Sequence, residues 1–352
     1  MITEQQTNTD TAKIPILHAL AGNSNETPPI WLMRQAGRYL SEYRQIRKDA
    51  GGFLNMCYSP SLASEVTLQP IRRFNFDAAI IFSDILVIPH AMGVGLDYIN
   101  GEGPVLEKIT SDERIDKLKI DNILPHLEPV FEALRKTKKE LPEKTALVGF
   151  AGAPWTVATY MVEGGGSKQF AEVKTLAYNN PVLFERLINI LVDSTITYLC
   201  AQVEAGAQVL QIFDSWAAVL ADDGSFEKWC IEPIAKIVSG VKEKYPNIPI
   251  IGFPKGAGLR YEQFIHKTGI DGVGIDYSVP LKFAADKLQP HVCVQGNMDP
   301  LLLASDKNMA VKEAKRIISI LGDGPFIFNL GHGIVPHTPI EHVQALIKTV
   351  RG

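Results

Sequence analysis

The sequence predicts an α/β fold, a (β/α)8 barrel with its active site at the C-terminal ends of the strands, in one domain over residues 14–352. Two observations carry this prediction: eight short apolar runs recur along the chain, each ending in a polar residue, and helical stretches separate them. The runs are rich in Val, Ile and Phe without clean alternation, which is typical of parallel strands buried on both faces. No Pro-, Gly- or Ser-rich linker divides the chain.

The expected strands are the eight apolar runs, in chain order 29–34, 78–84, 146–152, 209–215, 248–255, 272–276, 292–297 and 326–332. An open doubly wound sheet is the main alternative. That fold usually carries a glycine fingerprint after its first strand, whereas here Gln-Ala-Gly-Arg-Tyr follows the first run. The sequence therefore favours the barrel.

Two helices stand out between and after these strands. Residues 180–204 carry apolar side chains at three- and four-residue spacing, which lets one stripe of the helix pack on a sheet. Residues 338–350 open with Thr-Pro-Ile-Glu, so we expect Thr338 to cap the helix, Pro339 to occupy its first position and Glu341 to reach back to the cap.

The composition narrows the class of protein. Of 352 residues 46% are apolar and 21% charged, as in globular enzymes, and the formal net charge of −4 gives no basic face for nucleic acid. No apolar run reaches 18 residues, so no membrane span is expected. Residues 1–13 are polar, do not resemble a signal peptide, and are expected to form a frayed tail. The scattered cysteines predict no disulfide framework and a cytoplasmic location; they are Cys57, Cys200, Cys230 and Cys293.

Polar residues at the strand ends are the first candidates for chemistry, because active sites of such barrels lie there. A strand end is also where solvent begins, so each has an equally simple structural explanation. The candidates are Arg34, Asp84, Ser215, Lys255, Asp276, Asn297 and His332.

The first run ends in a pair of arginines, Arg34 and Arg38, separated by Gln-Ala-Gly. Arginine suits carboxylates because its planar fork donates two parallel hydrogen bonds. If a helix starts after Met33, both side chains lie on one face and repel each other unless an anion joins them. Gly37 would let the backbone approach a ligand closely. The alternative is a solvated helix start; the position at the barrel mouth favours an anion clamp.

Seven stretches of the chain closely resemble the uroporphyrinogen decarboxylase family. They are collinear and together span nearly the whole chain, which makes the set far more specific than any one of them. They read LMRQAGRYL (32–40), FSDIL (82–86), GFAGAPWTVATYMVEG (149–164), FDSW (213–216), GFPKGAG (252–258), QGNMDP (295–300) and NLGHGI (329–334). One departure is Ser41, where the family commonly has proline, which should alter only a local turn or helix start.

The resemblance implies a decarboxylase of heme biosynthesis that removes carbon dioxide from the four acetates of uroporphyrinogen III and gives coproporphyrinogen III. Members of the family use no cofactor and no metal, because the protonated pyrrole accepts the electrons that cofactors otherwise take up. The family also suggests a homodimer with facing clefts, a small-molecule substrate, and neither nucleic acid nor membrane as partner.

The resemblance also implies roles for individual residues. Asp84 would accept hydrogen bonds from the pyrrole N–H groups and stabilise their developing positive charge; otherwise it would cap the next helix. Arg34 and Arg38 would bind substrate carboxylates, and one of them could help to deliver the proton, a role left open because the pKa of arginine is so high. The remaining residues expected to bind substrate are Gln35, Ala36, Gly37, Tyr160, Ser215 and His332. For the last three the structural alternatives are a buried aromatic, a helix cap and a loop histidine bonded to a carbonyl.

Several other readings of the residues remain open. A zinc-dependent corrinoid or methionine-synthase-like methyltransferase shares this barrel, and His291 and Cys293 lie on one face of a strand, but towards its N-terminal end. A catalytically inactive tetrapyrrole carrier would not need Asp84 with both arginines. Lys255 could suggest Schiff-base chemistry, although an electrostatic or structural role is favoured. The glycines 164–166 lack the Lys-Ser/Thr of a phosphate loop and are expected to form a flexible loop.

Overall fold

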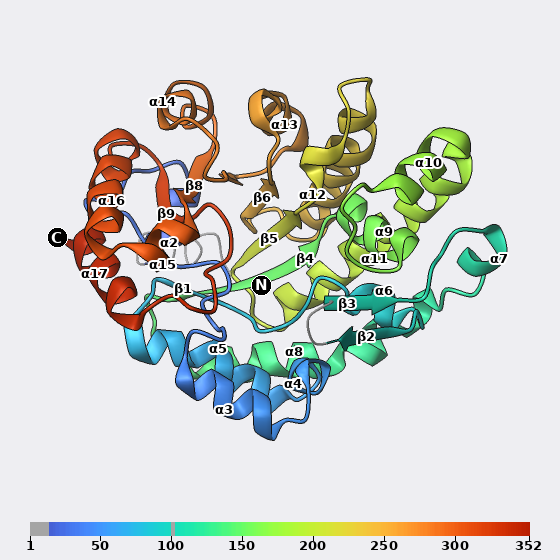
Figure 1. The fold of residues 1–352 in the computed structure, drawn as a ribbon, viewed down its shortest axis with the longest axis horizontal. Coiled ribbons are helices and arrows are strands. Elements are labelled where there is room, and N and C mark those ends of the chain that lie inside the picture. Colours follow the sequence, from blue (N-terminus) through green and yellow to red (C-terminus); the bar gives the residue numbers. More distant parts are fainter. Residues whose placement is uncertain (1–13, 100–102) are drawn as a thin grey trace.

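Seven parallel strands curl into a barrel in the computed structural model, which describes residues 14–99 and 103–352. The tail expected over residues 1–13 lies outside the described residues. The sheet runs in the order β1-β4-β5-β6-β7-β8-β9, so each barrel strand pairs with the barrel strand that follows it in the sequence (Figure 1). The strands are β1 Ala78–Ile80, β4 Ala146–Gly152, β5 Val209–Asp214, β6 Ile250–Pro254, β7 Gly272–Gly274, β8 Cys293–Met298 and β9 Phe326–Leu330. The predicted barrel class is confirmed.

The first predicted strand, residues 29–34, closes the barrel without forming a regular strand. Ile30 makes one isolated parallel bridge with Phe328 of β9. On the other side, the Ile30 carbonyl accepts the Asp77 N–H at 3.0 Å. Trp31 N–H still donates to the Phe328 carbonyl at 3.3 Å, but the donors next to it use side chains: Met33 N–H, for example, donates to Asn329 Oδ1 at 3.0 Å. Pro29 lacks an N–H altogether. Side-chain acceptors therefore replace part of a strand ladder, which no periodicity could predict.

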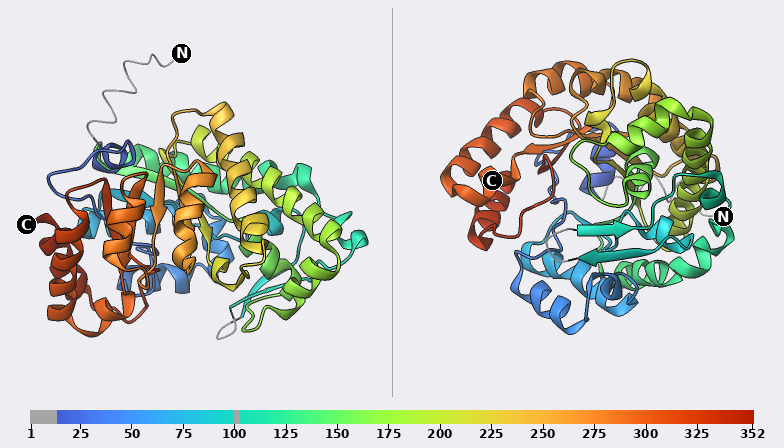
Figure 2. Two further views of the ribbon diagram at one scale, coloured as in Figure 1. Left: turned by 90° about the horizontal axis from the view of Figure 1, so that it is seen from above. Right: turned by 45° about the vertical axis from the view of Figure 1, so that its right-hand side comes forward.

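Helices surround the strands as an outer ring, most clearly in the right-hand view of Figure 2. The longer helices are α3 Ser41–Asp49, α5 Pro60–Phe74, α8 Ile123–Glu140, α9 Pro154–Glu163, α10 Ala171–Asn179, α11 Pro181–Glu204, α12 Glu232–Lys244, α13 Tyr261–Thr268, α16 Lys307–Leu321 and α17 Ile340–Arg351. Short helices are α2 Pro15–Leu20, α4 Phe53–Cys57, α6 Val87–Ala91, α7 Asp112–Ile115, α14 Leu281–Phe283 and α15 Pro300–Ser305. Short 3-10 and π segments complete the helical structure: η1 Ile120–Asn122, η2 Ala217–Val219, η3 Glu227–Ile231, η4 Gly258–Arg260 and η5 Ala284–Leu288. The described apolar side chains form one connected core from Ile14 to Val350.

The two predicted helices are present, with different caps. Asn180 caps α11 by accepting the Leu183 N–H at 3.2 Å, a bond that contributes about 0.5–2 kcal/mol. The expected capping box of α17 does not form. The Thr338 hydroxyl donates to the Val335 carbonyl at 2.9 Å instead, and the helix starts at Ile340 after an uncapped Pro339. The preceding turn, rather than the helix, uses the threonine.

A two-stranded hairpin lies between β1 and α8 and was not among the predicted elements. It pairs β2 Leu96–Ile99 with β3 Gly103–Leu106 in antiparallel register. Because it belongs to the connection that leaves the C-terminal end of β1, it stands at the mouth of the barrel. Val105 bridges to Gly165, so the glycine segment after α9 packs against the hairpin.

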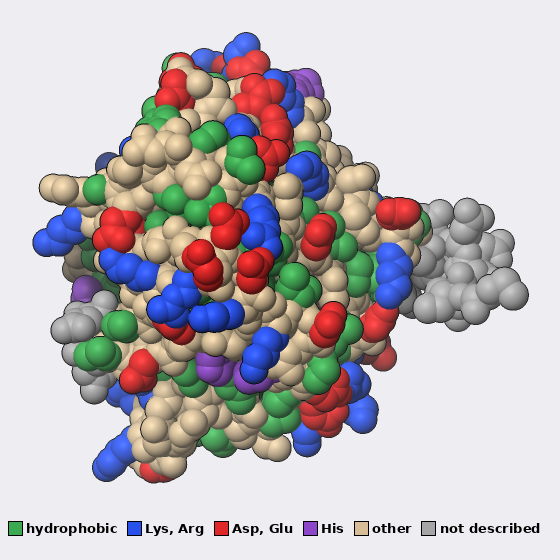
Figure 3. Space-filling model, turned by 90° about the vertical axis from the view of Figure 1, so that its right-hand side faces the viewer, with side chains coloured by type: hydrophobic (Ala, Val, Ile, Leu, Met, Phe, Trp, Pro, Cys, Tyr) green, Lys and Arg blue, Asp and Glu red, His purple; other side chains and the backbone are tan. Residues whose placement is uncertain are grey.

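Surface charges are mixed on the face that carries α7 and α10, where acidic and basic side chains intersperse (Figure 3). Ion pairs link neighbouring elements there: Arg186 of α11 pairs with Asp112 at 2.9 Å and with Asp116 at 2.5 Å. No helix in the described part of the chain is long and apolar enough to cross a membrane. All four cysteines are buried and free.

Candidate active site

Asp84 lies four residues beyond β1, in the turn that leads into α6. One carboxylate oxygen, Oδ1, accepts the Leu86 N–H at 2.8 Å, so part of the group serves the turn. Asp84 does not cap α6, whose N-cap residue is Leu86 and which has no side-chain cap. Burial raises the Asp84 pKa, and the Tyr98 hydroxyl, the Leu86 N–H and the Arg34 charge partly offset that rise. The carboxyl group is thus partly desolvated, while three neighbours favour its ionised form.

Tyr98 on the hairpin was not among the predicted site residues. Its hydroxyl is buried without a well-aligned hydrogen bond in the described chain, yet it interacts with Asp84, and burial together with that carboxylate raises the Tyr98 pKa strongly. The sequence signal was present: an Asn-Gly pair, a strong hairpin marker, directly follows Ile99. The hairpin therefore brings a neutral hydroxyl donor to the same carboxylate.

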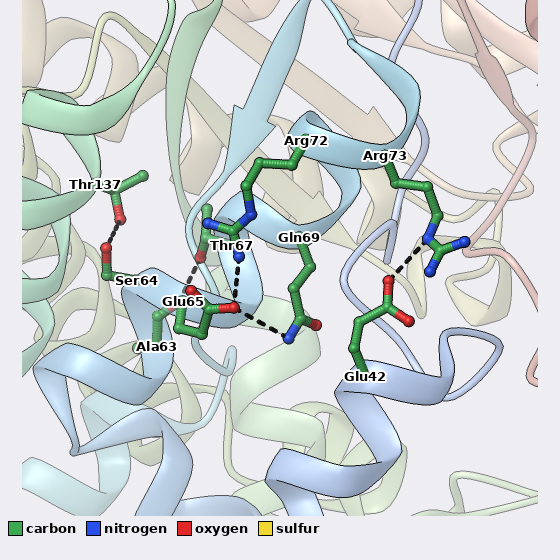
Figure 4. Close-up of polar contacts among 9 residues, drawn as sticks. All are labelled: Glu42, Ala63, Ser64, Glu65, Thr67, Gln69, Arg72, Arg73 and Thr137. Atoms are coloured by element: carbon green, nitrogen blue, oxygen red, sulfur yellow. Dashed lines mark hydrogen bonds and ion pairs between the residues drawn. The ribbon is translucent and has the colours of Figure 1, made fainter.

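Helix α5 supports the loop that carries Asp84. The Thr67 hydroxyl accepts the Phe82 N–H at 2.9 Å, two residues before Asp84, while it donates to the Ala63 carbonyl at 2.7 Å. Figure 4 shows the bonds that fix α5 itself: Ser64 accepts from Thr137 of α8 at 3.0 Å, and Arg73 pairs with Glu42 of α3 at 2.8 Å. These contacts hold both the Asp84 loop and the helix that follows Arg38.

Arg34 has a left-handed backbone, with φ of 63°, which is uncommon for a residue with a side chain. Residues 34–38 form turns, and no helix starts after Met33, so Arg34 and Arg38 do not share a helix face. The next helix is α3, which begins at Ser41. Both arginine side chains are exposed. The turn thus presents two cations to solvent from separate positions. Ser41 heads α3, as expected from its place in the sequence, and bonds Glu42 at 3.0 Å.

The three residues between the arginines build this turn. Gln35 is fully buried, and its amide bonds the backbone at both ends: it accepts from Leu32 N–H at 3.1 Å and donates to the Ala78 carbonyl at 2.9 Å. A Cβ atom on Gly37 would lie 2.8 Å from the Arg34 carbonyl, so glycine is required by the turn itself. Ala36 is half-buried against the core.

Tyr160, on α9, faces both charged groups. Burial and the Asp84 carboxylate raise its pKa, while an interaction with the Trp216 side chain and the Arg34 charge lower it. The two aromatic rings lie 6.1 Å apart between centroids. Ser215 is half-buried in the turn after β5, and no hydrogen bond of its hydroxyl is present within the described residues, so it caps no helix.

His332 sits between two glycines that pack tightly. A Cβ atom on Gly331 would collide with the Tyr277 backbone, and one on Gly333 would collide with the Arg34 side chain. Burial and the positive charges of Arg34 and Lys255 lower the His332 pKa to about 3 against the opposing effect of Asp276, so the imidazole is neutral at physiological pH. The ring accepts or donates no hydrogen bond within the described chain, unlike the expected loop histidine held by a carbonyl.

Two other strand-end residues are committed to the scaffold. Asp276 accepts four hydrogen bonds, from the Ser278 N–H and hydroxyl, the Gly256 N–H and the Tyr261 hydroxyl; these overcome the effect of burial and lower its pKa. Asn297 is buried and donates to the carbonyls of Asp276 and Val279 at 3.2 and 2.9 Å. Both side chains thus hold the backbone at the ends of their strands.

Asp214, the last residue of β5, is a buried carboxylate that the sequence did not single out. Its Oδ1 accepts the Thr156 hydroxyl at 2.5 Å, and Thr156 in turn accepts the Trp216 N–H at 3.1 Å. Burial raises the Asp214 pKa to about 6, although Thr156 and the Cys230 thiol lower it. This chain of bonds fixes the turn that contains Ser215.

The residues proposed for a zinc site lie elsewhere. Cys293 begins β8 and is buried in apolar surroundings, which raises its pKa far above the ordinary thiol value, and His291 is exposed and packs on His266 with ring centroids 4.5 Å apart. Over residues 14–99 and 103–352, no group of three or more His, Cys, Asp or Glu side chains could hold a metal ion. The arrangement does not resemble a zinc site.

Five side chains at the mouth of the barrel lie close enough for the charge of one to shift the pKa of another. They are Arg34, Asp84, Tyr160, Lys255 and His332. A carboxylate beside exposed guanidinium groups and a neutral imidazole can hold an acidic ligand and stabilise a developing cation.

Comparisons with known proteins agree with this picture. The sequence profile of the family described as Uroporphyrinogen decarboxylase (URO-D) matches residues 11–352. A uroporphyrinogen decarboxylase from Rhodospirillum rubrum is 56% identical over 96% of this chain and 97% of its own, and one from Mesorhizobium japonicum is 52% identical over 96% and 97%.

Solved structures support the fold. A methyltransferase from Methanosarcina mazei superposes with a TM-score of 0.76 over 96% of this chain and 97% of its own, at 20% identity. A B12-independent methionine synthase from a Shewanella species reaches 0.52 over 92% and 95%, at 10% identity. At these identities the likeness concerns the barrel alone.

Proposed function

The chain belongs to the uroporphyrinogen decarboxylase family and is a carboxy-lyase of tetrapyrrole biosynthesis, and from that premise we propose how its residues act. The substrate is uroporphyrinogen III, a flexible reduced tetrapyrrole with four acetate and four propionate side chains. Each acetate loses carbon dioxide and becomes a methyl group, which gives coproporphyrinogen III.

Each decarboxylation consumes one proton and needs an electron sink. Protonation of a pyrrole α-carbon beside the reacting acetate creates a cation. The C–CO2 bond then breaks and its electron pair flows into that ring, leaving an exocyclic methylene. Protonation of the methylene carbon gives the methyl group, and loss of the first proton restores the pyrrole. Because the substrate itself accepts the electrons, the proposed reaction needs neither a cofactor nor a metal.

Asp84 stabilises the cationic ring in this mechanism. Its carboxylate accepts hydrogen bonds from pyrrole N–H groups, and the contact strengthens as the ring becomes positive. Support comes from its surroundings: the Leu86 N–H and the Arg34 charge favour the ionised form, although burial disfavours it. A desolvated anion interacts more strongly with a cation than a hydrated one.

Arginines and three neutral side chains hold the substrate. Arg34 and Arg38 bind substrate carboxylates, because they are exposed cations on the turn beside Asp84. The turn residues Gln35, Ala36 and Gly37 form the side of the site between the two arginines, which we call the arginine wall; Gln35 fixes it through its bonds to the backbone. Three further side chains at the barrel mouth contact the substrate's arms: Tyr160, Ser215 and His332.

The observation that carries the proposal is a half-buried carboxylate, that of Asp84, which lies within the electrostatic influence of Arg34 at the same end of the barrel. Incubation with uroporphyrinogen III in the dark, without oxygen or added metal, tests it. Chromatography should detect hepta- through tetracarboxylate products. Unchanged uroporphyrinogen, or turnover that appears only when a metal is added, would contradict the proposal.

We also propose that the protein is a cytoplasmic homodimer, as the family resemblance suggests. Four buried, unpaired cysteines fit a reducing compartment. Light scattering of the purified protein should give twice the chain's 38.8 kDa, and a mass of 38.8 kDa would contradict the dimer.

A further inference from the structure

Lys255 directly follows β6 at the barrel mouth, and its ammonium group forms no ion pair within the described residues. Its backbone is fixed, because the Lys255 N–H donates to the carbonyls of Asp214 and Phe253, both at 3.1 Å. The side chain is half-buried, yet its Nζ makes no hydrogen bond or ion pair with any residue in 14–99 or 103–352. A partly desolvated ammonium group without an acceptor is costly unless a ligand completes it.

The carboxylate that interacts with Lys255, that of Asp276, does not fill this role. Asp276 interacts electrostatically with Lys255, but its two oxygens already accept four hydrogen bonds from Gly256, Tyr261 and Ser278. Asp276 therefore offsets part of the lysine's charge without forming an ion pair. Its bond to Gly256 instead fixes the backbone directly after Lys255.

Tight contacts connect Lys255 to the arginine wall. The Gly256 N–H donates to Asp276 at 2.7 Å, the Asp276–Tyr277 backbone packs on Gly331, and Gly333 packs on the Arg34 side chain. His332 lies between those glycines and experiences the charges of both Arg34 and Lys255. The lysine and the arginine also repel each other directly. Two cations thus face one neutral imidazole across the end of the barrel.

We propose that Lys255 Nζ binds a side-chain carboxylate of the tetrapyrrole. Together with Arg34 it forms a second carboxylate-binding subsite, next to His332. This proposal rests on the proposed function and deepens its substrate-binding site. A carboxylate there would neutralise the mutual repulsion of the two cations and supply the acceptor that Nζ lacks. Schiff-base chemistry does not fit, because the tetrapyrrole's acetates and propionates offer no aldehyde or ketone to form an imine.

Two ligands can show whether the carboxylate bound by Lys255 belongs to an acetate or to a propionate. Coproporphyrinogen III carries only propionates, and its Kd is measured by anaerobic titration; uroporphyrinogen III carries both kinds and is followed by KM and kcat. Lys255→Met should raise the KM for uroporphyrinogen III, the Kd of coproporphyrinogen III, or both, about tenfold, since one charge-assisted contact is lost. The kcat should stay within about threefold of the wild-type value. A rise in both identifies a propionate, and a rise in KM alone identifies an acetate.

Lys255→Arg should retain most of the affinity, because it keeps the positive charge that Lys255→Met removes. If Lys255 had only a structural role, affinity would not follow the charge in this way. Lys312→Met, on the exposed side of α16, is the matched control and should change neither constant. Unchanged Kd and KM in folded Lys255→Met would overturn the proposal. Absence of decarboxylation by the wild type would instead refute the proposed function.

A measurement on wild-type protein decides the matter even if the methionine variant does not fold. Burial and Arg34 lower the Lys255 pKa, so a larger share of its amine is unprotonated and open to acylation. If a propionate fills the subsite, bound coproporphyrinogen III should protect Lys255 from acetic anhydride severalfold; if an acetate does, uroporphyrinogen III bound to the slow Asp84→Ala variant should do so, and Lys312 should label equally in every sample. Equal labelling of Lys255 with and without each ligand would show that no carboxylate occupies the amine.

Discussion

Gly333 lies directly against the side chain of Arg34: a Cβ atom at position 333 would be 2.8 Å from Arg34 Cγ and closer still to Cδ. The arginine's aliphatic stem is thus held by the backbone of the loop after β9, which also carries His332. Arg34 needs this support because its backbone is in the left-handed region.

Gly333→Ala should displace Arg34 and weaken substrate binding about tenfold, with a loss of about 1–3 kcal/mol in stability from overpacking. KM and denaturant unfolding measure the two effects. Gly166→Ala is the control, since nothing lies within 4 Å of the added methyl group. Equal behaviour of both variants would mean that the contact does not position Arg34.

Asp84→Ala should reduce kcat by about 100-fold or more with the fold intact, because the charge that stabilises the transition state is lost. Circular dichroism establishes folding and product chromatography gives the rate. A folded variant with near-normal product formation would remove Asp84 from the mechanism. In the wild type, activity should decline as pH falls through the raised Asp84 pKa, since the protonated acid cannot stabilise a cation.

Arg34→Ala and Arg38→Ala should each weaken binding of the octacarboxylate about 10- to 100-fold, because hydrogen bonds to charged groups contribute about 1.5–3 kcal/mol. Anaerobic titration measures the Kd. Arg316→Ala, on the exposed face of α16, serves as control. Unchanged affinity would exclude the substituted arginine from the site.

Thr67→Val should cost about 1–3 kcal/mol of stability, because it leaves the buried Phe82 N–H without its acceptor. It should also lower kcat, since Phe82 leads into the Asp84 turn. Thr197→Val provides the comparison: that hydroxyl bonds only its own helix, on an exposed side of α11. Loss of stability without any change in kcat would separate this bond from the placement of Asp84.

Asp214 makes the stability of the fold depend on pH. Its folded pKa of about 6 exceeds the ordinary 3.8, so between these values the unfolded chain releases the proton while the folded one retains it, and stability falls as pH rises. Two units correspond to about 3 kcal/mol. Asp214→Asn should therefore gain up to about 3 kcal/mol relative to wild type from pH 4 to pH 7 in denaturant unfolding. Asp193→Asn, exposed on α11, should show no such trend.

What the sequence could predict was local or periodic. Buried strands and the α11 stripe depend on neighbours in the chain, and the strand-end rule pointed to Arg34, Asp84 and His332. The closure by residues 29–33 could not be predicted, since the Ile30 and Met33 donors find acceptors on side chains distant in the sequence. The Asp214 carboxylate was equally hidden: only the packed barrel shows it to be buried beside Thr156 and Cys230.

The barrel closes and the arginine wall forms in the same folding step. Met33 N–H reaches Asn329 across 296 positions of the chain. During synthesis on the ribosome, Arg34 emerges early, yet the loop that holds it arrives almost last. A nascent or prematurely terminated chain lacking β9 would therefore contain both arginines and Asp84 and still have no assembled site.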